Sequence, residues 1–184
     1  DRETMTSAIS YALSGHLVLS TLHANNSYHA LGRILSFYTP EARPALLSDL
    51  AAGLKAVVSQ RLLRSTAGGR VPAVEVMLNT KHVSELIERG DFTSIKEAMD
   101  KSLAEGSQTF EQELARLITE GHITRDEGLA YADSPTNLMW RLQNATTTQS
   151  KIVPQKEDVS EGPSFTEIQL DVRPDDRGFS TTRY

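Results

Sequence analysis

One histidine, His23, is a candidate for phosphate chemistry because of the residues around it. His16 and His23 bracket a nearly continuous apolar run, residues 17–22, and Thr21 lies near its end. A run of this kind is typical of a strand buried on both faces of a parallel sheet. Ligands of open α/β sheets bind at the carboxyl ends of the strands, where we expect His23. A helix predicted to begin a few residues later would offer free N–H groups to the same anion.

Two other interpretations of these histidines stay open from the residues alone. His23 would equally well satisfy a backbone carbonyl in an ordinary loop. His16, His23 and His29 lie close in sequence, as a metal site would need, but their spacings of seven and six residues match no usual ligand pattern. No carboxylate lies between them either. We therefore expect no metal here.

Composition excludes several classes of function. The 184 residues carry a net charge of −5, so no overall basic field draws the chain to nucleic acid. The absence of cysteine excludes disulfides and cysteine-bound zinc, and no apolar run approaches the ~20 residues of a membrane span. We expect a cytoplasmic protein. A helical pattern begins within three residues of Asp1, which is not Met, so we also expect a chain cut from a larger domain.

Periodicity predicts the elements that would position these residues. Strand signals on either side of Gly68-Gly69 predict a hairpin, or two neighbouring strands, of residues 60–64 and 71–78. Together with the strand at 17–22 and the helices between, this order favours an α/β sheet. The spacing of apolar residues predicts helices over residues 3–14, 27–37, 44–58, 83–87, 93–104, 109–120, 124–132 and 135–142.

The character of the chain changes twice. Residues 1–78 are predicted to form the α/β part, and residues 79–143 a small all-helical unit. Residues 144–184 are too polar to offset the entropy of ordering, so we expect a disordered tail. Within that tail, apolar residues alternate with polar ones at strand period over 168–172. Two interpretations of this short segment stay open: a strand that docks on the sheet edge of a partner, or merely an apolar patch in the disordered tail.

Several blocks of the sequence together resemble one family of motor proteins. Asp1-Arg2-Glu3-Thr4 is similar to the acidic segment that follows the Walker B strand of secretion-superfamily ATPases, and residues 15–25 resemble their histidine box. Further similar blocks lie at residues 58–63, 69–76, 108–110 and 132–135. The missing four-cysteine zinc insertion favours the branch of type IV pilus retraction ATPases, the PilT/PilU type. The segment His82-Val83-Ser84-Glu85 departs from the usual retraction motif and resembles the accessory PilU-like branch.

The resemblance implies the C-terminal portion of a RecA-like P-loop ATPase domain, followed by a small α-helical unit and a disordered tail. It implies ATP and Mg²⁺ as ligands, bound mainly by residues outside this chain, because the sequence has no Gly-x-x-x-x-Gly-Lys-Ser/Thr loop. The implied site residues are His23 as catalytic residue, Asp1, Arg2 and Glu3 beside the nucleotide, and a histidine box of His16, Thr21 and His23.

The implied partners are a homo-hexamer or a mixed ring with a paralogous retraction ATPase, and an inner-membrane pilus platform protein. Nucleic acid is not among them. Two alternatives remain: a non-catalytic ring-assembly subunit of the pilus machine, and a type II secretion-type ATPase.

Other conspicuous side chains have structural interpretations. Arg61, Arg64 and Arg70 are predicted to form a solvated hairpin edge rather than a nucleotide or subunit contact. Glu75 stands inside an apolar strand and needs a partner, for which we expect an ion pair. Trp140 is predicted to pack the last helix against the rest of the fold.

Overall fold

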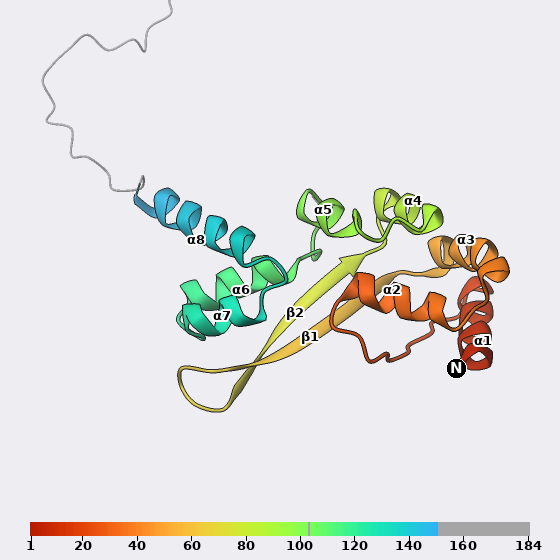
Figure 1. The fold of residues 1–184 in the computed structure, drawn as a ribbon, viewed down its shortest axis with the longest axis horizontal. Helices are drawn as coiled ribbons and strands as arrows, with labels where there is room; N and C mark the ends of the chain where they lie inside the picture. Colours follow the sequence, from red (N-terminus) through yellow and green to blue (C-terminus); the bar gives the residue numbers. More distant parts are fainter. Residues whose placement is uncertain (103, 151–184) are drawn as a thin grey trace, which may run out of the picture. The chain divides into compact units, whose positions relative to one another are not determined.

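An antiparallel hairpin organises the chain. In the computed structural model, which describes residues 1–102 and 104–150, β1 (Ala56–Arg64) pairs with β2 (Arg70–Leu78), and Arg61 lies opposite Ala73 (Figure 1). Gly68 and Gly69 at the turn have φ angles of +91° and +74°, which L side chains disfavour. The predicted hairpin is confirmed.

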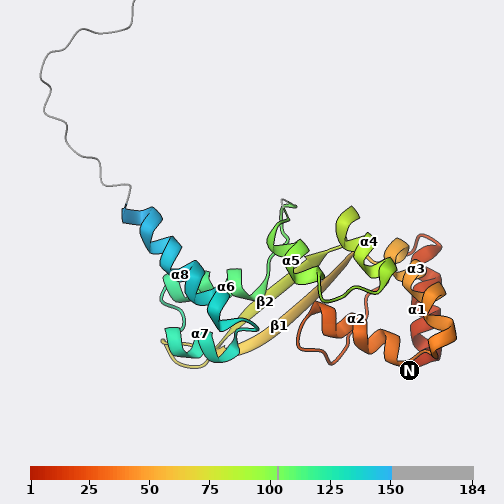
Figure 2. The same cartoon turned by 45° about the horizontal axis from the view of Figure 1, so that its top comes forward.

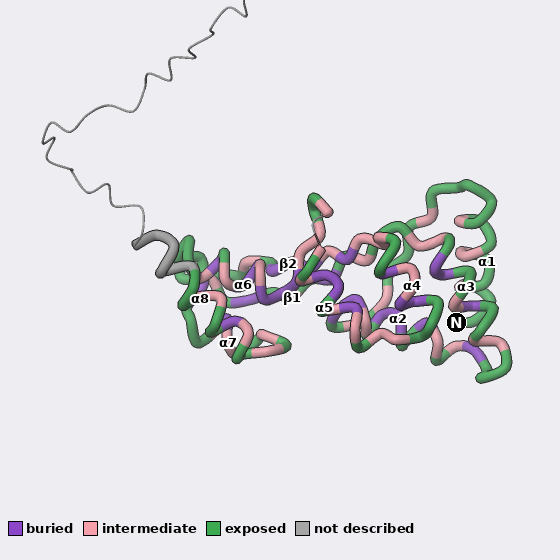
Figure 3. The backbone as a smooth tube through the Cα atoms, turned by 90° about the horizontal axis from the view of Figure 1, so that it is seen from above, coloured by how far each residue is buried: buried purple, intermediate pink, exposed green. Residues whose placement is uncertain are grey.

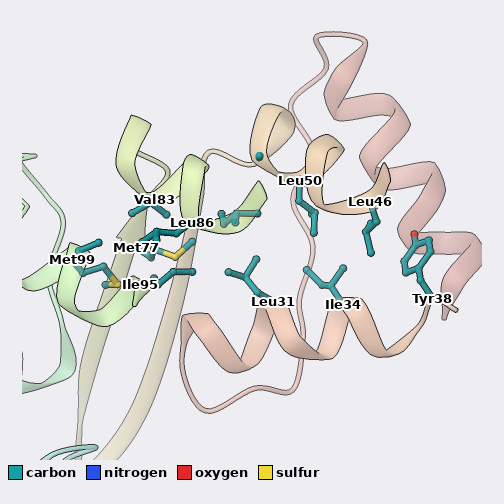
Figure 4. Packing of buried hydrophobic residues seen from close by; sticks show 13 residues of the cluster. Leu31, Ile34, Tyr38, Leu46, Leu50, Met77, Val83, Leu86, Ile95 and Met99 are labelled. Carbon is teal, nitrogen blue, oxygen red and sulfur yellow. The ribbon is translucent and has the colours of Figure 1, made fainter. Parts of the chain in front are cut away.

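One end of the hairpin lies in the first hydrophobic core. Met77 of β2 is buried there, and Leu31 and Ile34 on one face of α2 point toward Leu46 and Leu50 of α3 (Figure 4). The elements around this core are α1 (Arg2–Leu13), α2 (Ser27–Ser36), the 3₁₀ turn η1 (Pro40–Ala42), α3 (Arg43–Gly53), α4 (Lys81–Arg89) and α5 (Ile95–Asp100).

Local signals explain where these helices begin and end. The Thr80 hydroxyl caps the first turn of α4 by accepting from the Val83 N–H, and Gly90 ends the helix with a φ of +71°. The helix predicted over 44–58 was too long at its end, because α3 stops at Gly53. Residues 56–58 belong to β1, which suits the β-branched Val57 and Val58.

The other end of the hairpin lies in a second core. Leu63 and Ala73 are fully buried there against Phe110, Leu114 and Leu138. These residues come from α6 (Phe110–Thr119), which begins with a reciprocal capping box, and from α8 (Pro135–Ser150); α7 (Arg125–Tyr131) completes the group. Buried positions follow the middle of the hairpin, whereas α1 is exposed or half-buried along its length (Figure 3).

The positions of the two cores neither support nor contradict the predicted domain boundary at residue 78. Figure 2 shows α4 and α5 beside the β2 end that the first core covers, and their apolar residues share that core with α2 and α3. The helical unit of residues 79–143 is therefore spread over both cores. Its independence as a domain stays a prediction.

The predicted buried strand at 17–22 is wrong. Residues 16–24 have no regular secondary structure, and Leu17 and Leu19 are each 87% exposed. A strand buried on both faces needs a neighbour on each side. Within the described residues the sheet consists of β1 and β2, and neither pairs with this segment.

The last helix also differs from expectation. The predicted tail begins at residue 144, but α8 continues to Ser150, because extending a helix from packed turns is far easier than starting one. Trp140 does not pack this helix and is 63% exposed. Leu138 and Leu142, one turn apart, face the second core, and Trp140 lies two positions from each, on another face.

Residues 151–184, including the predicted docking strand at 168–172, lie outside the described part of the chain. No helix in the described residues combines the length and apolar character that crossing a membrane requires.

A pair of leucine variants tests the exposure of residues 17–22. Leu31→Ala should lower the unfolding free energy of the 184-residue chain by about 3 kcal/mol, since it empties a fully buried site. Leu19→Ala should change it by less than about 0.5 kcal/mol, because the side chain is exposed. Urea denaturation followed by circular dichroism measures both. Equal losses in the two variants would show that residues 17–22 are buried in solution.

Candidate functional site

His23 lies in the loop before α2, beside an open depression with a volume of about 270 Å³. Ala24, Asn25, His29 and Arg33 form the rest of its lining. His29 and Arg33 lie one turn apart on α2, so their side chains share a face of that helix. No carboxylate lines the depression. Three side chains that carry or can acquire positive charge therefore meet at one surface, which suits an anion such as phosphate.

Two of the first three N–H groups of α2, those of Ser27 and His29, already have partners within the chain. The Glu75 carboxylate accepts hydrogen bonds from the Ser27 N–H and the Ser27 hydroxyl, each at 2.8 Å. The Asn26 side chain accepts from the His29 N–H at 2.9 Å. The helix N-terminus expected to bind phosphate is thus used in large part by the chain's own carboxylate and cap, and most contacts to a ligand fall to side chains.

Glu75 itself is 2% exposed. Burial raises the pKa of its carboxyl, against the opposing effect of the two Ser27 hydrogen bonds. The ion pair predicted for this residue is wrong, because its hydrogen-bond partners in the described residues are the Ser27 groups. A carboxylate at a helix N-terminus is favoured by the helix dipole, which explains how β2 tolerates it.

Arg61 holds the loop from the hairpin side. Its guanidinium donates to the Asn25 carbonyl from Nε at 3.3 Å and Nη2 at 3.1 Å, and to the Tyr131 carbonyl from Nη1 at 2.5 Å. Nη2 also pairs with Asp133 Oδ1 at 2.6 Å, and the group lies 3.8 Å from the centroid of the Phe110 ring. With 14% of its side chain exposed, Arg61 is not part of a solvated edge as predicted.

Asp133 connects Arg61 with the side chain of Asn26. Its second oxygen, Oδ2, accepts from Asn26 Nδ2 at 3.3 Å. Asp133 lies in the block of residues 132–135 that resembles the family, but no local sequence signal pairs it with Arg61, because the two lie 72 residues apart.

The other predicted site residues lie elsewhere. Asp1 caps α1, Glu3 is exposed in its first turn, and Arg2 lies 5.6 Å from the ring centroid of Tyr38. Tyr38 follows the end of α2, whereas His23 precedes its start. The ten residues of α2 span about 15 Å, so residues 1–3 and His23 lie at opposite ends of that helix (Figure 1).

His16 and Thr21 have only local surroundings. His16 Nδ1 lies 3.0 Å from the Ser14 hydroxyl, and its ring meets Tyr11 edge-on at 5.7 Å between centroids. Thr21 is exposed. Within residues 1–102 and 104–150, no group of three or more histidine, aspartate or glutamate side chains is placed to hold a metal ion.

Comparison with known proteins identifies the family. The family model described as "Type II/IV secretion system protein" matches residues 1–68. The type IV pilus ATPase PilU of Pseudomonas aeruginosa is 44% identical over 138 residues, which is 74% of this chain and 36% of that protein. This chain belongs to the PilT/PilU family of type IV pilus retraction ATPases. The resemblance inferred from the sequence is therefore confirmed.

Further relatives agree with this family. The pilus retraction ATPase PilT of Pseudomonas aeruginosa is 31% identical over 137 residues, 74% of this chain and 40% of that protein. A crystal structure of the retraction motor PilT with bound ADP matches with a TM-score of 0.68 and 29% identity, over 76% of this chain and 39% of that chain. The expected mixed α/β fold is thus confirmed over part of the length of that structure. The chain spans less than half the length of each of these relatives.

The titration of Glu75 gives a prediction with a defined sign. A raised pKa means that the folded chain holds this proton more tightly than the unfolded chain. The resulting stability is present below the unfolded pKa and is lost as pH rises through the folded pKa. Relative to Glu75→Gln, the wild-type chain should therefore lose stability as the pH rises above about 4.3, the ordinary pKa of a glutamate in the unfolded chain. Urea unfolding at a series of pH values measures the difference, with the exposed Glu88→Gln as control.

A stability of the wild-type chain that rises with pH, relative to Glu75→Gln, would have a different cause. If the wild-type chain gained on Glu75→Gln as pH rose, the N-terminus of α2 would stabilise the carboxylate by more than burial destabilises it.

Proposed function

We propose that this chain is the C-terminal portion of a RecA-like motor ATPase, which couples ATP hydrolysis to type IV pilus retraction. The observation that carries the proposal is the position of His23: the histidine-box residue of a PilT/PilU family member lines a carboxylate-free depression with His29 and Arg33. Such a surface is suited to the terminal phosphate of a nucleotide.

His23 is the proposed catalytic residue. Its imidazole would donate an N–H to an oxygen of the γ-phosphate and so respond to the presence of that phosphate. Arg33 adds a fixed positive charge at the same surface. Asp1, Arg2 and Glu3 stay proposed neighbours of the nucleotide, at a part of it remote from His23.

The described residues do not form a magnesium site, because no three carboxylate or histidine groups converge. The Mg²⁺ that accompanies ATP in this class would be held by other residues. The sequence also lacks the Gly-Lys-Ser/Thr loop that binds the phosphates. This absence, together with the partial cover of its relatives, supports a chain that works as part of a larger ATPase.

The proposed assembly is a hexameric ring, formed by copies of one protein or mixed with a paralogous retraction ATPase. It would act in the cytoplasm against the inner-membrane pilus platform protein. The segment that departs from the retraction motif begins α4, where Val83 is buried and the Ser84 hydroxyl donates to the Ala51 carbonyl at 2.9 Å. These two positions serve packing. The identity of 44% with PilU, against 31% with PilT, supports the accessory, PilU-like role.

The isolated chain should bind ATP weakly and should not hydrolyse it. The reason is the missing phosphate-binding loop, which supplies most phosphate contacts in this class. Isothermal titration with ATP and a phosphate-release assay on the purified 184-residue chain check this. Micromolar affinity with turnover would place a complete nucleotide site within these residues.

His23→Ala should lower turnover by more than tenfold, about 1.4 kcal/mol of barrier, in an active protein that contains this chain. A suitable protein is a chimera in which the chain replaces the matched segment of PilT. The melting temperature should change little, since His23 is exposed. For His16→Ala we expect any loss to appear in the melting temperature rather than in kcat. The exposed His122→Ala is the matched control.

Normal turnover of the His23→Ala chimera, or its unfolding, would retire the phosphate role of His23. The residue would then be an ordinary loop histidine.

A further inference from the structure

We propose that Arg61 is a positioning residue for His23, and that its guanidinium clamps the loop of residues 23–26 to the helices α6, α7 and α8. This inference rests on the proposed phosphate role of His23. The clamp is defined here as Arg61, Asn25, Asn26, Tyr131 and Asp133.

Every nitrogen of the Arg61 guanidinium donates a hydrogen bond. Nε and Nη2 converge on the Asn25 carbonyl, Nη1 reaches the Tyr131 carbonyl, and Nη2 also binds Asp133. Four donations from one planar group fix its orientation as well as its position. A lysine would keep the charge, but its single ammonium cannot make this fork.

The base of the clamp is rigid. The Arg61 guanidinium lies 3.8 Å from the centroid of the Phe110 ring, and Phe110 is a fully buried residue at the start of α6. The turn before α8 is held as well, because the Ser134 N–H donates to the buried Glu111 carboxylate at 2.8 Å. The same Glu111 oxygen pairs with Lys96 at 2.7 Å. The guanidinium therefore cannot follow a movement of the loop without disturbing the second core.

The loop is gripped at two successive residues. Arg61 binds the Asn25 carbonyl, and Asp133 Oδ2 accepts from the Asn26 side chain at 3.3 Å. Asn26 also caps α2, the helix that carries His29 and Arg33. One ion pair thus sets the place of the loop and the start of the helix on the two sides of the depression.

His23 is two residues from the Asn25 carbonyl, a distance of at most about 7 Å along the chain. Its side chain is exposed, so its position depends on the backbone that the clamp holds. Misplacing a catalytic group by about 1 Å can lower turnover by a hundredfold. The clamp would therefore affect kcat through His23, and affect substrate affinity much less.

The first test uses the 184-residue chain. Amide and imidazole signals of residues 23–26 are followed by NMR in Arg61→Lys, in Asp133→Asn and in Arg64→Lys, an exposed arginine on the same strand. The first two variants should shift these signals and the control should not. Asp133→Asn keeps size and removes the charge, so it carries the test if Arg61→Lys does not fold.

The second test measures turnover in the PilT chimera. Arg61→Lys should lower kcat by about tenfold with a smaller change in KM, whereas Arg64→Lys should leave both unchanged. In a His23→Ala background, Arg61→Lys should have little further effect, because it acts through His23.

The outcomes separate the two proposals. Unmoved signals in both clamp variants, or an Arg61→Lys loss that persists in full without His23, would overturn the positioning role. Normal turnover of His23→Ala would instead overturn the proposed function of His23, whatever the clamp variants do to the loop signals, and would leave Arg61 a structural residue.

Discussion

The pairing register of β1 with β2 is the constraint on which both cores and the loop after His23 depend. Alternate residues of the two strands face the helices. Met77 enters the first core, Leu63 and Ala73 enter the second, and the polar pair of Arg61 and Glu75 lies between them. A slip of one residue in either strand would turn its members of this set to the opposite face. The hairpin thus places two polar side chains between two apolar cores in one step.

These two polar residues each bind a backbone group at the start of α2. Glu75 accepts from the Ser27 N–H, and Arg61 donates to the Asn25 carbonyl. Buried or half-buried peptide groups need such partners, and here the hairpin supplies both. The consequence for chemistry is that the Ser27 N–H and the Asn25 carbonyl are already engaged and are not offered to a ligand. Recognition at the depression falls to the side chains of His23 in the loop and of His29 and Arg33 on α2.

The sequence predicts well whatever depends on neighbours along the chain. The stop of the short helix at Gly90 and the turn at Gly68-Gly69 act within a few residues, and these elements were found as expected. It predicts poorly what depends on distant partners. The apolar run at 17–22 would form a strand only between other strands, and the described residues provide none beside it. Arg61 looked like a solvated arginine because its partners lie 36, 70 and 72 residues away.

The residues of the clamp are not all shared with the same relatives. The match to the secretion-system family model ends at residue 68, so it includes Arg61 and Asn25 but not Tyr131 or Asp133. The match to PilU extends over 138 residues and must therefore reach into the helices that follow β2. The side of the clamp that carries His23 thus belongs to the segment shared with the wider secretion family, and the side that anchors it comes from helices beyond that segment. The Arg61 guanidinium satisfies its donors only when both the loop and the residues before α8 are in place. The stability of the second core is therefore coupled to the position of the loop. Movement of that loop would therefore be transmitted to α6 and α8 through Arg61.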